Sequence, residues 1–118
     1  ANFDKFKLYW NVTNGSGYDL ASSSANKPIV YRLSNKNNPE FKEVNFNPPF
    51  KNNLYFIYLG KKQNTYSEIL NFNKLKIKEK SILKVSSITE KILSCDSLED
   101  FKSLIKEHER ILSQILGR

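Results

Sequence analysis

The residues best suited to chemistry lie in the stretch Gly15-Ser16-Gly17-Tyr18-Asp19. Two glycines on either side of a serine allow positive φ angles and the close approach of a ligand or of another chain segment. Asp19 follows in the first turn of an expected short helix, where the helix dipole favours a carboxylate. The Asp19 carboxylate would then lie close to a ligand or chain segment held by the glycine turn. The alternative is a helix-terminal charge after two ordinary turn glycines, and the spacing alone does not separate the two.

A second group of polar residues follows the most apolar segment of the chain, residues 53–59. Lys61, Lys62 and Thr65 come shortly after this segment, and α/β proteins place ligand contacts at the carboxyl ends of strands. Their side chains could contact a carboxylate or a phosphate. The alternative is a lysine-rich turn in which Thr65 or Asn64 caps the next helix.

The elements that must position Asp19 are a short helix and a hairpin. Small residues over 21–25 continue the helix, and Pro28 stops it. Residues 29–33 predict a strand, and the cluster of residues 34–39 predicts a turn. The period-two alternation over 41–46 predicts a second strand paired with the first. Before the glycines, the aromatic residues fit either a helix end or a strand and are assigned mainly to the core: Phe3, Phe6 and Trp10.

The second half of the chain begins after Pro48 and Pro49, which can continue neither a ladder nor a helix interior. Residues 53–59 are continuously apolar, which predicts a strand buried on both faces, and a helix starts near Thr65. Two amphipathic helices follow and predict an antiparallel pair, the first ending at Asp96 and Ser97. Ser97, with Asp100 three residues later, resembles a capping box at the start of the second helix. Their apolar stripes contain Ile82, Val85, Ile88, Ile92 and Cys95, then Leu98, Phe101, Leu104, Ile105, His108, Ile111, Leu112, Ile115 and Leu116. On these stripes Cys95 is interpreted as a small buried hydrophobe and His108 as a core or edge residue.

Composition narrows the class of protein. The 19 Lys and Arg residues against 12 Asp and Glu give a net charge of +7, which raises the question of a nucleic-acid partner. Lysine outnumbers arginine 16 to 3, and the positive charge is spread along the whole chain. Both features favour a solvated lysine-rich surface instead of a nucleic-acid site.

A single cysteine excludes an intrachain disulfide, and no Cys/His cluster has the spacing of metal ligands. Without a membrane-length apolar run or a leader, we expect a cytoplasmic protein with no membrane partner.

Residues 15–21 (Gly-Ser-Gly-Tyr-Asp-Leu-Ala), with the small residues after them and residues 28–32 (Pro-Ile-Val-Tyr-Arg), resemble a known segment. It is the aspartate-bearing segment of the GHMP kinase superfamily, which comprises galactokinase, homoserine kinase, mevalonate kinase and phosphomevalonate kinase. The mevalonate and phosphomevalonate branch is the most similar. Residues 54–65 and 98–116 also look like that branch.

This resemblance implies a parent kinase that uses ATP and Mg²⁺ to phosphorylate an alcohol or phosphate oxygen of a small metabolite, mevalonate-like or sugar-like. Asp19 matches the aspartate that orients or deprotonates the acceptor. The implied fold is α+β, a partial GHMP kinase fold: a short helix and antiparallel strands, a strand–helix unit and an antiparallel helix pair. Residues 1–49 would be the tail of the N-terminal kinase domain and residues 50–118 the first half of the C-terminal domain. The implied substrate-binding residues are Gly15, Ser16, Gly17, Lys61, Lys62 and Thr65, and no residue is assigned to a metal.

Two motifs of the superfamily are missing: the serine- and glycine-rich loop for the ATP phosphates and a late glycine-rich motif. Because the sequence also lacks methionine, we expect a central fragment that is inactive and binds no cofactor by itself. Such a fragment would expose apolar edges, so we expect it to pair with a second copy or a strand-swapped neighbour.

Two further functions stay open. One is a small basic α+β module that binds an acidic partner or nucleic acid. The scarcity of arginine and the lack of a nucleic-acid motif argue against nucleic acid. The other is a helical-hairpin interaction domain without chemistry. The lysines of the basic module would be Lys61, Lys62, Lys74, Lys76, Lys78 and Lys80.

Overall fold

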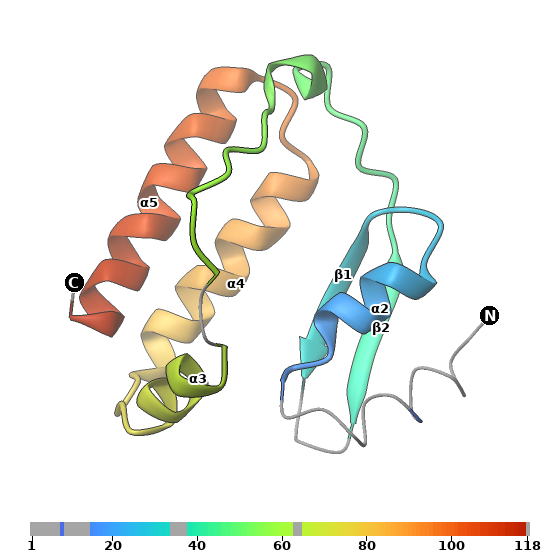
Figure 1. Ribbon diagram of the computed structural model, residues 1–118. Helices are drawn as coiled ribbons and strands as arrows, with labels where there is room; N and C mark the ends of the chain where they lie inside the picture. The colour runs from blue at the N-terminus through green and yellow to red at the C-terminus, as the bar shows by residue number, and fades with distance from the viewer. Residues whose placement is uncertain (1–7, 9–14, 34–37, 63–64, 118) are drawn as a thin grey trace. The chain divides into compact units, whose positions relative to one another are not determined.

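The computed structural model describes residues 8, 15–33, 38–62 and 65–117, apart from the side chains of Thr65 and Tyr66. The predictions for Phe3, Phe6 and Trp10, and for the cap at Asn64, lie outside this part of the chain. The elements are α2 (Tyr18–Ser24), β1 (Ile29–Leu33), β2 (Pro39–Glu43), the 3₁₀-helix η1 (Lys51–Asn53), α3 (Thr65–Asn73), α4 (Glu79–Leu93) and α5 (Leu98–Leu116) (Figure 1). The α+β class is therefore confirmed. Contacts divide the chain into unit 1, residues 1–46, and unit 2, residues 47–118.

Unit 1 is built from α2 and the β1–β2 hairpin. The two strands are antiparallel, and Tyr31 lies opposite Phe41 with the ring centroids 6.3 Å apart. Such a cross-strand aromatic pair stabilises a two-stranded ribbon, which is marginal without other packing. Helix α2 contacts β1, and its Ala21 is fully buried. The predicted order of turn, short helix, turn and strand is confirmed, with the second strand starting at Pro39, earlier than its alternation predicted.

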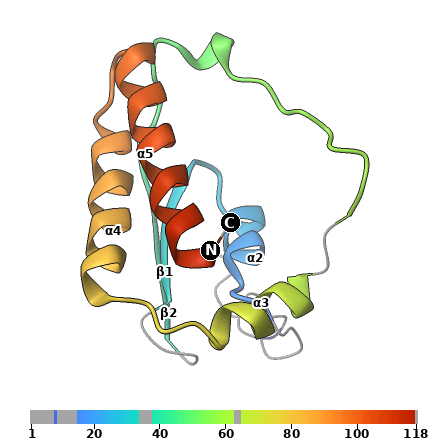
Figure 2. The ribbon, with the colours of Figure 1, turned by 90° about the vertical axis from the view of Figure 1, so that its left-hand side faces the viewer.

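Unit 2 contains α3 and the helix pair of α4 and α5. The two long helices run antiparallel side by side, as predicted (Figures 1 and 2). Ile88 and Ile111 are buried, whereas the predicted stripe position Ile82 is 51% exposed. Helix α4 ends at Leu93, before the predicted end at Asp96 and Ser97, so Cys95 lies in the link.

The link between α4 and α5 is closed by local hydrogen bonds. The Ser97 hydroxyl accepts a hydrogen bond from Asp100 N at 3.1 Å, which confirms its predicted role as the N-cap of α5. The Cys95 thiol is half-buried and donates to the Ser97 carbonyl oxygen at 3.3 Å. Cys95 therefore packs as a small side chain at the edge of the helix pair instead of deep in its core.

Phe50 attaches the start of unit 2 to the helix pair. Its side chain is buried, and its ring lies 5.0 Å from the ring of Phe101 on α5. The two rings are tilted by 40°, within the range of favourable aromatic packing. The chain leaves Phe50 through η1, and the residues that follow, from Tyr55 to Leu59, are largely exposed.

The prediction of a strand over residues 53–59 is wrong for this chain. Residues 54–59 are extended but belong to neither a strand nor a helix. Tyr55 to Leu59 are 81 to 108% exposed, and Figure 2 shows this segment (green) apart from α4 and α5. Strand formation requires a neighbouring chain segment with free backbone groups, and none of the described residues of unit 2 pairs with it.

None of the described helices is long and apolar enough to cross a membrane.

Candidate functional site

The glycine turn and the start of α2 form the candidate site of unit 1. Gly17 is buried and has φ 84° and ψ 1°, the left-handed conformation that permits the chain to turn directly into α2. The first helical hydrogen bond runs from Ala21 N to the Gly17 carbonyl oxygen at 3.0 Å. Because of this turn, Asp19 falls in the first turn of α2, as predicted.

Asp19 presents its carboxylate to solvent. Its side chain is exposed, and Oδ1 accepts a hydrogen bond from Leu20 N at 3.0 Å. Within the described part of the chain, Asp19 forms no salt bridge, and its Oδ2 accepts no hydrogen bond. One oxygen is thus held by the backbone, and the other is available to a hydroxyl group of a ligand.

Tyr31 fixes the turn from the neighbouring strand, and sequence reasoning did not assign it a role. Its hydroxyl donates a hydrogen bond to the Ser16 carbonyl oxygen at 2.6 Å. Partial burial raises the pKa of Tyr31, and the negative charge of Asp19 raises it further. The carboxylate and the phenol are therefore close enough to interact electrostatically. Only the strand register could have pointed to Tyr31, because the residue lies 15 positions from Ser16.

The influence of Asp19 on Tyr31 can be measured. We expect Asp19→Asn to lower the pKa of Tyr31, while burial keeps it above the ordinary value of 10.0. NMR titration of tyrosine-labelled chain measures this pKa. Glu40→Gln, an exposed substitution on β2, is the matched control and should leave it unchanged. An identical Tyr31 pKa in Asp19→Asn and the unmodified chain would contradict the proximity of the two groups.

The same shift has a consequence for stability. A raised pKa means that the folded chain holds the Tyr31 proton more tightly than the unfolded chain. The associated stabilisation is complete below pH ~10 and is lost as the pH rises through the raised pKa.

Gly17 gives a second prediction for this site. We expect Gly17→Ala to reduce the free energy of unfolding by about 1–2 kcal/mol, because an L-residue is strained at φ 84°. Gly15→Ala is the control, since no atom lies within 4 Å of a Cβ added there. Urea unfolding measures both. Equal stability of the two variants would show that the left-handed turn is not required.

The other predicted ligand residues lie in unit 2. Lys61 and Lys62 are exposed and follow the extended segment, before α3. Thr65 begins α3, and the predicted role of its side chain lies outside the described residues. Gly15, Ser16, Gly17 and Asp19 therefore lie together in unit 1. Lys61 and Lys62 lie in unit 2.

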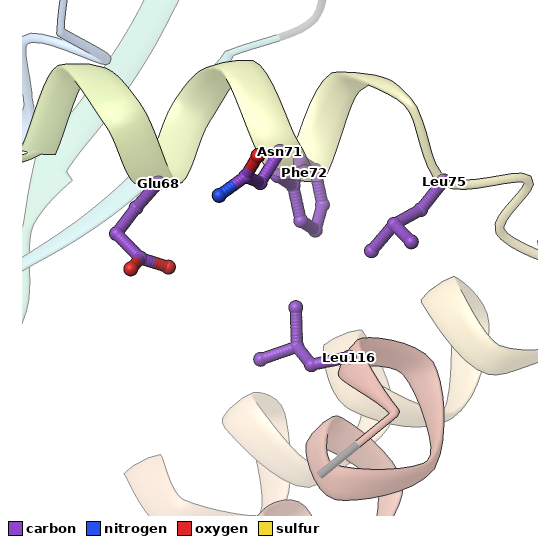
Figure 3. A pocket seen from close by; sticks show the side chains of 5 residues that line it. All are labelled: Glu68, Asn71, Phe72, Leu75 and Leu116. Carbon is purple, nitrogen blue, oxygen red and sulfur yellow. The ribbon is translucent and has the colours of Figure 1, made fainter.

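A hollow of about 260 Å³ lies between α3 and the end of α5 in unit 2 (Figure 3). Figure 3 shows α3 and the residues after it facing the end of α5, and the lining residues are Glu68, Asn71, Phe72, Leu75 and Leu116. Its volume is below the roughly 300–1,000 Å³ of ordinary ligand pockets, and it contains none of the predicted site residues. We assign no ligand to it.

Among the described residues, His108 and its neighbour Glu109 belong to no group that could hold a metal ion. The His108 side chain is half-buried on α5, with Nδ1 3.5 Å from an Oε1 of its neighbour Glu109. In the described part of the chain, no group of three or more His, Cys, Asp or Glu side chains could hold a metal ion. His108 lies at the edge of the helix pair, consistent with a packing role.

Comparison of the chain with protein-family models, with curated proteins and with solved structures finds no match. The resemblance to GHMP kinases therefore stays a prediction carried by the residues themselves.

Proposed function

We propose that the chain belongs to an ATP-dependent small-molecule kinase of the GHMP type, with Asp19 as the group that orients and deprotonates the acceptor. The supporting observation is the exposed Asp19 carboxylate, held through one oxygen by Leu20 N after the left-handed turn at Gly17. General-base catalysis requires a carboxylate within hydrogen-bonding reach of the acceptor hydroxyl, and a backbone hydrogen bond restricts its orientation.

In the proposed reaction, the acceptor hydroxyl donates its proton to the Asp19 carboxylate as its oxygen attacks the γ-phosphorus of ATP. A new O–P bond forms, the bond between the γ-phosphorus and the bridging oxygen breaks, and ADP leaves. In a loose transition state, the carboxylate mainly aligns the acceptor oxygen. The Gly15-Ser16-Gly17 turn forms the wall beside the acceptor, and Tyr31 holds this wall through the Ser16 carbonyl oxygen.

The nucleotide and its metal require residues beyond those described. ATP phosphates need a cradle of backbone N–H groups or a P-loop-like motif, and the 118 residues contain no such motif. The described residues also lack a carboxylate cluster suited to Mg²⁺, so we assign them no part in holding the metal. We propose that these 118 residues alone do not phosphorylate a substrate.

The test is a phosphotransfer assay on the complete polypeptide that contains these residues. ATP consumption is measured with small alcohols and phosphorylated alcohols, including mevalonate, phosphomevalonate and a sugar phosphate, and the 118-residue chain is assayed in parallel. We expect turnover by the complete polypeptide and none by the 118 residues. A complete polypeptide that transfers no phosphate to any of these acceptors would contradict the proposal.

A basic binding module is the second candidate, favoured by one observation. Lys74, Lys76, Lys78 and Lys80 are all exposed around the link between α3 and α4. Binding of nucleic acid through them should weaken steeply as salt increases. Absence of DNA and RNA binding at low salt would remove the nucleic-acid version of this candidate.

A further inference from the structure

The extended segment Leu54–Leu59 is the largest unexplained feature of the described chain. It contains six consecutive apolar or aromatic residues, and five of them, from Tyr55 to Leu59, are almost completely exposed. An exposed run of this kind marks an interaction surface, because scattered single hydrophobic residues are normal but contiguous ones are not. Apolar residues on both faces are typical of a strand that is buried within a sheet.

The backbone N–H and C=O groups of this segment are also available for pairing with another strand. The hydrogen bond from Leu54 N to the Lys51 carbonyl oxygen closes η1, and no other backbone hydrogen bond within the described residues involves residues 55–59. A second polypeptide segment can therefore pair with it without breaking an existing ladder. The resulting hydrogen bonds would satisfy a row of donors and acceptors along one edge.

We propose that two copies of this chain associate by antiparallel pairing of residues 54–60 around a two-fold axis at Ile57. In such a pair, Ile57 lies opposite Ile57 of the second copy, Phe56 opposite Tyr58, and Tyr55 opposite Leu59. Aromatic and β-branched residues opposite one another are the favourable cross-strand combinations. A two-fold axis closes the contact after two copies, so the interface is complete in a dimer.

The available area supports a dimer. Aromatic side chains bury roughly 150–250 Å² each, so Tyr55, Phe56 and Tyr58 alone present about 450–750 Å². Leu54, Ile57 and Leu59 add to this area. Standard stable interfaces bury about 800 Å² per partner. Strand pairing by itself covers only part of this area, so a stable dimer also requires side-chain packing between the two copies across the faces of the paired strands.

Charge favours one register of the strand pairing. It also distinguishes a second copy of this chain from an acidic partner. Pairing around Ile57 places Lys61 and Lys62 opposite Asn53 and Asn52, whereas pairing around Phe56 would place Lys61 opposite Lys51. Like charges directly opposite each other destabilise a strand pair, so the Ile57-centred register is preferred. Because each copy has a net charge of +7, added salt should strengthen the dimer by screening repulsion.

Disulfide trapping tests the register. In a Cys95→Ser background, Ile57→Cys places two cysteines opposite each other, with Cα atoms about 4.5–5.5 Å apart, within disulfide range. Tyr55→Cys is the matched control, because its two copies would lie about 13 Å apart along the strands. We expect mild oxidation to cross-link the Ile57→Cys chain and not the Tyr55→Cys chain. Cross-linking of Tyr55→Cys alone, or of neither, would overturn the proposed register.

Sedimentation equilibrium tests the association itself. We expect the unmodified chain to be a dimer at about 100 µM, and Ile57→Lys to weaken dimerisation by at least tenfold. Leu83→Lys is the control, because Leu83 is an exposed apolar residue of α4 outside the segment, and it should leave the dimer unchanged. Circular dichroism checks that both variants retain their helices. A monomeric unmodified chain, an open-ended series of larger assemblies, or a dimer weakened by salt would overturn the proposal.

Discussion

In the proposed kinase, replacing Asp19 by asparagine is expected to lower kcat by about 10²–10⁴-fold, the usual contribution of a positioned general base. Asparagine keeps the shape of the side chain and an oxygen that can accept from Leu20 N, so the turn at Gly17 should persist. It removes the basic oxygen and the negative charge. The affinity for ATP should stay nearly unchanged, because the proposal gives Asp19 no contact with the nucleotide.

Steady-state kinetics and direct ATP-binding measurements on the same variant separate these effects. Glu40→Gln is the matched control, since Glu40 is also an exposed carboxylate of unit 1 but lies on β2, opposite Arg32. It should preserve kcat. In the proposed kinase, a normal kcat of the Asp19→Asn variant would remove Asp19 from the mechanism, and an equal loss in Glu40→Gln would point to a general charge effect.

The largest expected effect on stability comes from Ile111→Ala. Ile111 is only 4% exposed and lies on the face of α5 that carries the core of the helix pair. Truncating a buried isoleucine removes packing and leaves a cavity, which typically costs about 2–5 kcal/mol. A small unit with few buried side chains has little stability in reserve, so we expect the α4–α5 pair to unfold at a much lower urea concentration.

Ile105→Ala is the matched control for this experiment. The residue belongs to the same helix and is also isoleucine, but it is 38% exposed. Its truncation should cost clearly less, because part of the side chain is already in water. Urea unfolding followed by circular dichroism compares the two variants. Equal destabilisation would show that the burial of Ile111 does not contribute to the stability of the pair.

Local sequence signals predicted most of the helices and the hairpin. Helix α5 was predicted because its apolar stripe has helical spacing and Ser97 precedes it as a cap, and both are short-range features. The β1–β2 hairpin was predicted from alternation and a turn cluster. The end of α4 was predicted too late, since the apolar Cys95 extended the stripe beyond Leu93, where the helix ends.

The candidate site was predictable only in part. The position of Asp19 in the first turn of α2 follows from the glycines before it, and its exposure follows from that position. The role of Tyr31 depended on the register of β1, which brings a phenol onto the carbonyl of a residue far earlier in the chain. No residue pattern within the glycine turn indicates this contact.

By itself, the sequence determined the elements whose causes are local: the glycine turn before Asp19, the cap at Ser97 and the two amphipathic helices. Only the tertiary structure decided which apolar residues are buried. Phe50 is covered by Phe101, whereas the more apolar segment Leu54–Leu59 stays exposed. The physical reason is that a helix satisfies its own backbone hydrogen bonds, but a strand requires a neighbour, and composition does not reveal whether that neighbour is present.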